Sequence, residues 1–216
     1  MNKRSTDPNG FDGRLSRLYT GSVDKQETYD QWARDYEKDL VEEMGYVGHI
    51  DAARVFSEVV PDRNCRVLDV ACGTGLVGRE LEQLGYQNIE GTDFSEGMLE
   101  KARATGRYRR LFTHDFTQDL QQSSDYDALI CVGLFSFDLP AVEHMIHVIR
   151  AVKTDSRCVL TVNGAAWREM DYATGLQTQS GLHGFAVESV REAGYIENQG
   201  IDGRVLVIRS PSDPHG

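Results

Sequence analysis

The stretch RVLDVACGTG, residues 66–75, determines how this chain folds. Its first five residues suit a buried parallel strand that contains an acidic side chain, and the loop after them holds Gly73 and Gly75. A helical pattern begins at Leu76. A strand, a tight glycine turn and a helix N-terminus together form a cradle whose backbone N–H groups point at a ligand. Glycine is needed there because a Cβ would block the left-handed turn or the close approach of the ligand.

Strands and helices alternate after residue 65, and this alternation predicts the fold class. Seven strands are expected, at residues 66–70, 88–92, 108–113, 128–132, 158–162, 195–201 and 204–208. Helices separate most of them, and the last third is predicted to hold helices around 167–176 and from Phe185 to Gly194. The pattern implies an α/β protein with a doubly wound, mostly parallel sheet. The hairpin-like link Asp202-Gly203 makes a terminal strand antiparallel.

Aromatic residues dominate the segment before the cradle. Tyr29, Trp32 and Tyr36 recur at helical spacing and predict a helix, and a second helix is expected from His49 to Val60. These helices either cover the ligand as a lid or pack into the core, and both roles are open. The predicted parts are a flexible arm (1–22), one domain (23–210) and a tail (211–216); the domain divides into a helical lid (23–62), a cofactor-binding half (63–165) and a substrate-side half (166–210).

Composition indicates an acidic protein without a membrane segment. The 216 residues suffice for one domain, and 23 basic against 34 acidic residues give a net charge of −11, which argues against a nucleic-acid surface. The longest apolar runs have the length of a strand, and the polar N-terminus is unlike a secretory signal. Four cysteines without CxxC spacing favour reduced thiols over metal ligands. We therefore expect a cytoplasmic protein with no metal; monomer and dimer are both open.

Two ligand classes fit the glycine spacing. Gly73-x-Gly75-x-x-Gly78, with Asp93 twenty residues past Gly73, satisfies the dinucleotide fingerprint and would suit a nicotinamide cofactor. Asp69 favours another ligand, since its carboxylate would repel a pyrophosphate and attract an amino group. The pair Asp115-Phe116 offers an acceptor for an exocyclic amine and an aromatic face for an adenine.

Four motifs carry a resemblance to a known family. Residues 67–75, 91–99, 114–116 and 126–130 resemble the first to fourth motifs of class I S-adenosylmethionine-dependent methyltransferases. The resemblance covers roughly residues 25–210 and implies the Rossmann-like methyltransferase fold, with the N-terminal helices as a lid. Residues 29–37 and 46–49 are similar to a smaller set, the methyltransferase-like proteins named after the Williams–Beuren chromosomal region.

The resemblance assigns roles to individual residues. Asp69 and the glycine loop would hold the methionine end of the cofactor, and Asp93 would accept two hydrogen bonds from the ribose hydroxyls through a carboxylate whose oxygens are both free. Asp93 then contributes to binding and little to folding stability, unless it merely caps the next helix. The full set of implied cofactor-binding residues is Tyr29, Trp32, Tyr36, Asp69, Ala71, Gly73, Thr74, Gly75, Asp93, Phe94, Met98, Asp115, Phe116, Val132 and Gly133.

No catalytic residue is evident, and the expected chemistry explains why. Methyl transfer from a sulfonium is an in-line displacement, so holding the groups in line and excluding water can supply most of the catalysis. If the acceptor needs a general base, the candidates are Asp138, His183 and His144. The expected acceptor is a small molecule or an exposed protein side chain. The alternatives are a non-catalytic protein that binds S-adenosylmethionine or S-adenosylhomocysteine, and a nicotinamide-dependent oxidoreductase.

Overall fold

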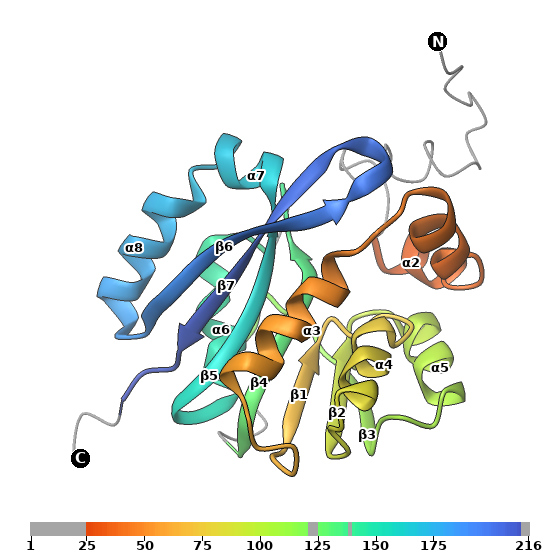
Figure 1. Ribbon diagram of the computed structural model, residues 1–216, viewed down its shortest axis with the longest axis horizontal. Helices are drawn as coiled ribbons and strands as arrows, with labels where there is room; N and C mark the ends of the chain where they lie inside the picture. Colours follow the sequence, from red (N-terminus) through yellow and green to blue (C-terminus); the bar gives the residue numbers. More distant parts are fainter. Residues whose placement is uncertain (1–24, 121–124, 138–139, 213–216) are drawn as a thin grey trace.

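A seven-stranded sheet forms the middle layer of the protein (Figure 1). The computed structural model describes residues 25–120, 125–137 and 140–212, so the predicted arm and most of the predicted tail lie outside the described residues. The strand order is β3-β2-β1-β4-β5-β7-β6. The strands are β1 (Val67–Val70), β2 (Ile89–Asp93), β3 (Arg110–Thr113), β4 (Tyr126–Phe135), β5 (Val152–Asn163), β6 (Ala186–Ile196) and β7 (Ile201–Arg209). The first five strands are parallel and β7 runs antiparallel to both of its neighbours, which confirms the predicted mixed sheet.

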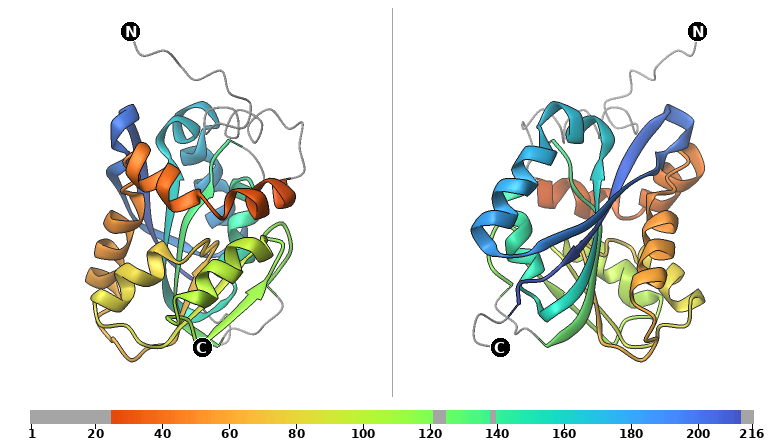
Figure 2. Two further views of the ribbon diagram at one scale, coloured as in Figure 1. Left: turned by 90° about the vertical axis from the view of Figure 1, so that its right-hand side faces the viewer. Right: turned by 60° about the vertical axis from the view of Figure 1, so that its left-hand side comes forward.

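Helices cover both faces of this sheet (Figure 2). The helical segments are α2 (Lys25–Trp32), η1 (Lys38–Glu43), α3 (Gly48–Val59), α4 (Leu76–Gln83), α5 (Glu96–Ala104), η2 (Val142–His144), α6 (Met145–Ile149), α7 (Gly164–Glu169), α8 (Tyr172–His183) and η3 (Glu197–Gln199). One hydrophobic core lies under α3 and α4, and a second lies under α6 and α8 on the opposite face. All four cysteines are free and buried in these layers.

The predicted strand–loop–helix cradle is present. All four residues of β1 are buried, because β2 and β4 flank the strand and helices cover both of its faces. Gly75 adopts the left-handed conformation at φ 99° and α4 starts at the next residue. The predicted cap of α5 is confirmed as well, since Ser95 Oγ accepts a hydrogen bond from the Met98 N–H at 3.1 Å.

The last third differs from the sequence prediction. The predicted helix from Phe185 to Gly194 is wrong: this segment is strand β6. Its apolar spacing suits a helix, but pairing along the length of β7 satisfies its backbone groups instead. The hairpin turn lies at η3 and Gly200, not at Asp202-Gly203, where Gly203 pairs with both Asn163 and Ala193.

The first predicted helix is interrupted. The chain turns after Trp32 and then forms the π-helical segment η1. The buried Trp32 Nε1–H donates to Asp39 Oδ2 at 2.8 Å. Seven residues of straight α-helix span about 10 Å, so the turn is what brings these two side chains together.

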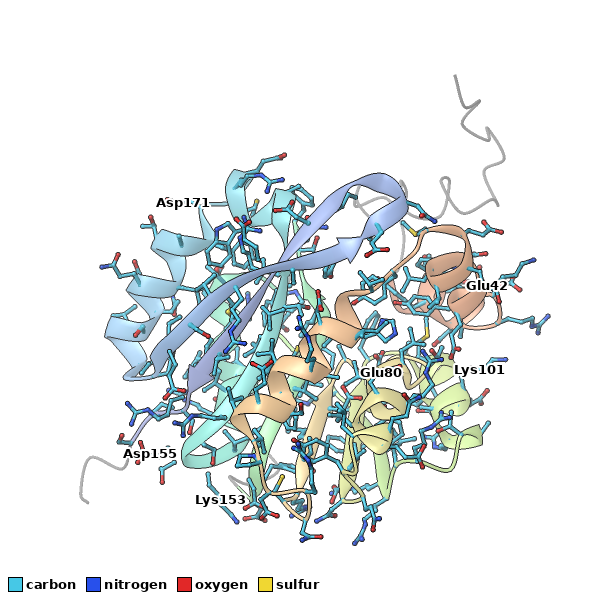
Figure 3. All side chains as sticks on the ribbon, in the orientation of Figure 1. Glu42, Glu80, Lys101, Lys153, Asp155 and Asp171 are labelled. Atoms are coloured by element: carbon cyan, nitrogen blue, oxygen red, sulfur yellow. The ribbon has the colours of Figure 1, made fainter. Side chains whose placement is uncertain are left out.

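Charged side chains cover the outside of the molecule. Figure 3 shows Lys101, Lys153 and Asp155 pointing outward from α5 and from the start of β5. In the part of the chain that the structure describes, no helix is both long and apolar enough to cross a membrane.

Candidate functional site

Three aspartates lie at the same edge of the sheet. Asp69 is the third residue of β1, Asp93 is the last residue of β2, and Asp115 follows β3 by two residues. These strands are parallel neighbours, so their carboxyl ends meet at one edge, where ligands of doubly wound sheets bind. Asp69 and Asp93 are buried and Asp115 is exposed. The sequence prediction of one carboxylate at each of three successive strand ends therefore agrees with the structure.

The glycine loop between β1 and α4 has open space above it. Gly73 adopts φ 55°, and a Cβ built on it would meet nothing within 4 Å. Thr74 Oγ1 is buried and has no hydrogen-bond partner within the described residues. An open left-handed turn beside an unpaired buried oxygen is a feature of a site that receives a polar ligand.

Ala71 opens the same loop in a left-handed conformation, at φ 58°. This conformation brings the Cβ of an L-residue too close to the backbone. We expect Ala71→Gly to stabilise the fold by about 1 kcal/mol, measured as a higher urea midpoint at unchanged m value. The matched control is Ala104→Gly on the exposed face of α5, which is expected to destabilise by about 0.5–1 kcal/mol. Equal losses in both variants would show that Ala71 is not strained.

Asp93 already holds two backbone groups. Its Oδ2 accepts the Gly73 N–H at 2.9 Å and its Oδ1 accepts the Ser95 N–H at 3.0 Å. The expectation that both oxygens are free is therefore wrong, although each oxygen retains a second lone pair. Burial raises the pKa of Asp93 to about 6, against the lowering effect of its backbone hydrogen bonds. The carboxylate thus ties the glycine loop to the end of β2, while Ser95 caps α5.

Asp69 is fully buried and is bonded to a residue that the sequence analysis missed. The Tyr108 hydroxyl donates to Asp69 Oδ2 at 2.7 Å, whereas Asp69 Oδ1 has no partner among the described residues. Burial is the main cause that raises the pKa of Asp69 to about 8; the hydrogen bond from Tyr108 lowers it and the charge of Asp93 raises it. Tyr108 lies between Arg107 and Arg109 in the sequence. A single aromatic residue within a run of arginines is the signal that could have predicted a buried side chain at this position.

The raised pKa of Asp69 makes stability depend on pH. An aspartate of the unfolded chain has a pKa of about 3.9, so between that value and about 8 the folded protein binds more protons than the unfolded chain. The free energy of unfolding is therefore expected to fall as the pH rises through this window, by at most about 1.4 kcal/mol per pH unit. Asp93 adds to the same trend up to about pH 6. Urea titrations of the wild type and Asp69→Asn between pH 5 and 8.5 test this, and parallel curves would contradict it.

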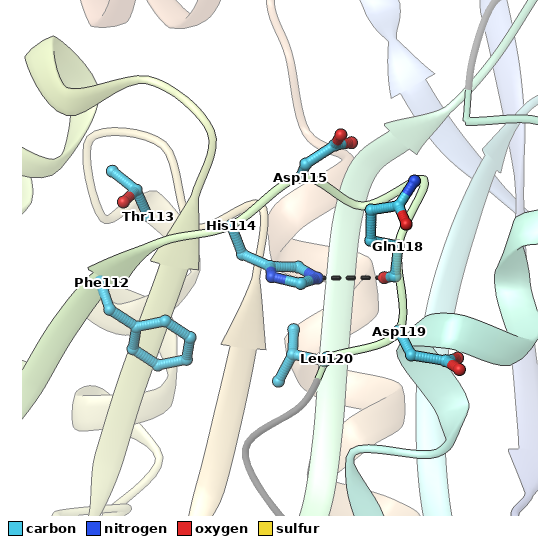
Figure 4. A pocket seen from close by; sticks show the side chains of 7 residues that line it. All are labelled: Phe112, Thr113, His114, Asp115, Gln118, Asp119 and Leu120. Atoms are coloured by element: carbon cyan, nitrogen blue, oxygen red, sulfur yellow. Dashed lines mark hydrogen bonds between the residues drawn. The ribbon is translucent and has the colours of Figure 1, made fainter.

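Asp115 lies in a tight turn beside a cavity. Its Oδ1 accepts hydrogen bonds from the Thr117 N–H at 2.9 Å and the Thr117 hydroxyl at 2.8 Å, which hold the pKa of Asp115 below its usual value. The Phe116 ring is buried in the core under α6, so its aromatic face is not presented to a ligand. A cavity of about 350 Å³ adjoins the turn. In Figure 4 the Phe112, His114 and Leu120 side chains lie on one side of the loop and Asp115 points away from them.

The N-terminal helix α2 contacts the loop after β2. The Tyr29 ring meets the Phe94 ring edge to face, at 5.2 Å between centroids. Asp30 Oδ1 accepts hydrogen bonds from the Ser95 hydroxyl and from the Gly97 N–H, the latter at 2.8 Å. Trp32 is 1% exposed and belongs to the core. The aromatic face of α2 therefore packs into the core and also reaches the loop that carries Phe94, so the core role is confirmed and the role as a lid stays a prediction.

Two tyrosines that the sequence analysis did not assign to the site lie beside the end of β4. Gly133 is exposed at φ 84°, and its N–H donates to Thr161 Oγ1 at 3.0 Å. A Cβ on Gly133 would lie 3.5 Å from the Tyr46 hydroxyl and 3.9 Å from the Tyr195 hydroxyl. Val132, the other residue predicted here, is buried.

The proposed general bases differ in where they lie. The His183 suggestion is wrong, because α8 ends there and β6 starts level with Arg157, at the edge of the sheet opposite to Asp93. His144 lies near Asp115, at the edge of the sheet that carries the three aspartates. Its Nδ1 accepts the Ala141 N–H at 3.1 Å. Asp138 lies outside the described residues. No group of three metal-ligating side chains was found within residues 25–120, 125–137 and 140–212.

The central part of the chain is similar to known proteins. The family model described as a methyltransferase domain matches residues 67–155. Methyltransferase-like protein 27 of Homo sapiens is 39% identical over 112 residues, which cover 50% of this chain and 45% of that protein. The chain thus spans less than half the length of this curated relative.

Solved structures share the fold. The magnesium protoporphyrin IX methyltransferase of Synechocystis PCC 6803, crystallised with S-adenosylmethionine, superposes with a TM-score of 0.61 at 22% identity over 97% of this chain and 100% of that one. A putative methyltransferase of Haloferax volcanii, in complex with the Trm112 activator, gives a TM-score of 0.67 at 15% identity over 89% of this chain and 100% of that one. At these identities the likeness concerns the fold.

Proposed function

Residues 67–155 form a methyltransferase domain of the class I S-adenosylmethionine-dependent family, and from this premise we propose that the chain transfers a methyl group to a small molecule or an exposed protein side chain. The observation that carries the proposal is the open glycine loop flanked by Asp69 and Asp93, two buried carboxyls on adjacent strand ends. The cofactor of this proposal is S-adenosylmethionine, which agrees with the methyltransferase-domain match; a nicotinamide nucleotide is the alternative that the binding experiment below tests.

The residues present fit this cofactor. Asp69 Oδ1 and Thr74 Oγ1, both buried and unpaired in the described part of the chain, suit the polar amino-acid end. The second lone pairs of Asp93 would receive the ribose hydroxyls. Phe94 and Met98 would pack on the adenine, and Asp115 would bind its amine. When bound, S-adenosylmethionine supplies an electrophilic methyl group on a sulfonium.

The chain's own residues would bind the cofactor, orient it and keep water out of the site. The two hydrogen bonds to Asp93 hold the glycine loop and the end of β2 in a fixed relation before a ligand arrives. The Tyr29–Phe94 contact would keep water away from the adenosine end. The methyl acceptor would enter where β4 ends, beside Gly133.

Calorimetry with S-adenosylhomocysteine and NADH tests the binding half of the proposal. Binding of the first and not of the second is the expected result. Turnover is then measured with methyl-labelled S-adenosylmethionine against a metabolite fraction and, in parallel, a protein fraction. Label in low-mass products supports a small-molecule acceptor and label in protein supports a side-chain acceptor. Binding with no transfer in either fraction would favour the alternative, a non-catalytic cofactor-binding protein.

A cytoplasmic location of the protein remains a prediction.

A further inference from the structure

One aromatic side chain fills the space beneath the glycine loop. Tyr108 precedes β3, and its ring passes over Gly91 of β2, where a Cβ would lie 3.0 Å from it. The same ring lies 3.2 Å from the Cβ position of Gly75, and a Cβ on Gly78 would overlap the Tyr108 hydroxyl. Three glycines, in the glycine loop, in α4 and in β2, thus leave room for a single ring. The third glycine of the fingerprint is required here by a side chain of the protein itself.

The Tyr108 hydroxyl joins two parts of the cofactor site. It donates to Asp69 Oδ2 at 2.7 Å and accepts the Gly78 N–H at 3.2 Å. Gly78 lies in the first turn of α4, so one hydroxyl connects the helix after the loop to the carboxyl group before it. Asp69 Oδ1 is left without a partner within the described residues.

The structure assigns Tyr108 as a positioning residue of the cofactor site, and this assignment rests on the proposed function. We propose that its hydroxyl holds Asp69 Oδ2 so that Oδ1 is presented to the α-amino group of S-adenosylmethionine. The last torsion of an aspartate side chain has a broad, roughly two-fold preference, so an unheld Asp69 would offer its oxygen over a wider range of directions. A held carboxylate gives up less freedom when it binds, which strengthens binding.

The other groups that face this pair do not replace Tyr108. Asp93 of β2 is occupied by the Gly73 and Ser95 N–H groups. Burial keeps the pKa values of the Cys72 and Cys131 thiols well above their usual value, so neither carries a charge. Arg103 of α5 is bonded to Glu96. Within the described residues, Tyr108 is the side chain seen to donate to Asp69.

A pair of ligands separates positioning from general support of the fold. 5′-Methylthioadenosine keeps the nucleoside and the sulfur of S-adenosylhomocysteine but lacks the amino-acid end. Calorimetry on Tyr108→Phe is expected to show a Kd for S-adenosylhomocysteine raised about 3- to 10-fold, because the free protein already contains the Tyr108–Asp69 bond and only the cost of ordering Asp69 is added to binding. The Kd for 5′-methylthioadenosine is expected to stay within about twofold of the wild type. The pH at which S-adenosylhomocysteine affinity reaches half its maximum is expected to move upward, because Asp69 loses the donor that lowers its pKa.

Tyr126→Phe is the matched control. Its hydroxyl donates to the buried Glu90 Oε2 at 2.8 Å, so the substitution removes the same kind of bond at the amino end of the strands. Affinity for both ligands should not change. If Tyr108→Phe does not fold, Tyr108→Leu removes the same hydroxyl and is measured with the same two ligands, again with selective weakening of S-adenosylhomocysteine as the expected result. Equal weakening of both ligands in the folded variant, or an unchanged S-adenosylhomocysteine affinity, overturns the inference. A wild type that binds neither ligand instead overturns the proposed function.

Discussion

Asp93→Asn is expected to weaken S-adenosylhomocysteine binding by about 10²- to 10⁴-fold. Two hydrogen bonds from ribose hydroxyls to a charged, buried carboxylate contribute about 1.5–3 kcal/mol each, and every 1.4 kcal/mol is a tenfold change. Asparagine keeps the shape but turns one acceptor oxygen into a donor. That donor would face the Gly73 or the Ser95 N–H, both of which the carboxylate accepts in the wild type.

The same contacts change what is expected of folding stability. From the sequence, Asp93 contributes to binding alone, but its two backbone hydrogen bonds predict that Asp93→Asn also lowers the free energy of unfolding, by about 1–3 kcal/mol. Urea denaturation and calorimetry measure the two effects separately. Asp62→Asn is the matched control: Asp62 accepts the Asn64 N–H at 2.9 Å on the surface before β1, and its loss should leave affinity unchanged. If Asp93→Asn bound S-adenosylhomocysteine as tightly as the wild type, the assignment of Asp93 to the ribose hydroxyls would be contradicted.

Gly97→Ala is expected to release α2 from α5. A Cβ on Gly97 would lie 2.8 Å from the Asp30 Cα and 3.0 Å from the Asp30 backbone oxygen, and backbone atoms cannot move aside as a side-chain tip can. Release would break the hydrogen bonds to Asp30 and the Tyr29–Phe94 contact, together about 2–4 kcal/mol. We expect faster trypsin cleavage at the exposed Arg34 and Lys38 and a Kd for S-adenosylhomocysteine raised at least about tenfold.

Gly181→Ala provides the control for this variant. Gly181 lies in α8, and a Cβ there would meet nothing within 4 Å. The substitution should leave cleavage and affinity as they are and stabilise the helix by about 0.5–1 kcal/mol. Faster cleavage of Gly97→Ala at an unchanged Kd would mean that α2 only packs against the core. It would contradict the prediction that α2 covers the cofactor as a lid.

The local elements of the site were predictable from the sequence. The β1 strand, the Gly73–Gly75 turn and the Ser95 cap of α5 appear where the pattern places them. Each depends on residues within a few positions of one another: the buried run of a central strand, the conformational freedom of glycine, and a hydroxyl that reaches an N–H three residues ahead. The sequence also predicted that the strand ends carrying the site lie at one edge of the sheet, because alternating strands and helices imply parallel strands.

Tertiary structure alone decided which side chains meet at that edge. Tyr108 bonds Asp69 across 39 positions and Asp30 bonds Gly97 across 67, and no local pattern encodes such pairs. The segment of β6 has apolar spacing that fits a helix, and its pairing with β7 overrides this preference. The antiparallel direction of β6 and β7 puts His183 at the edge of the sheet opposite to Asp93, so it cannot serve as the general base that the sequence suggested. Short-range sterics and capping act within a turn or a strand and can be seen in the sequence, whereas the partners of a buried polar group depend on how distant segments pack.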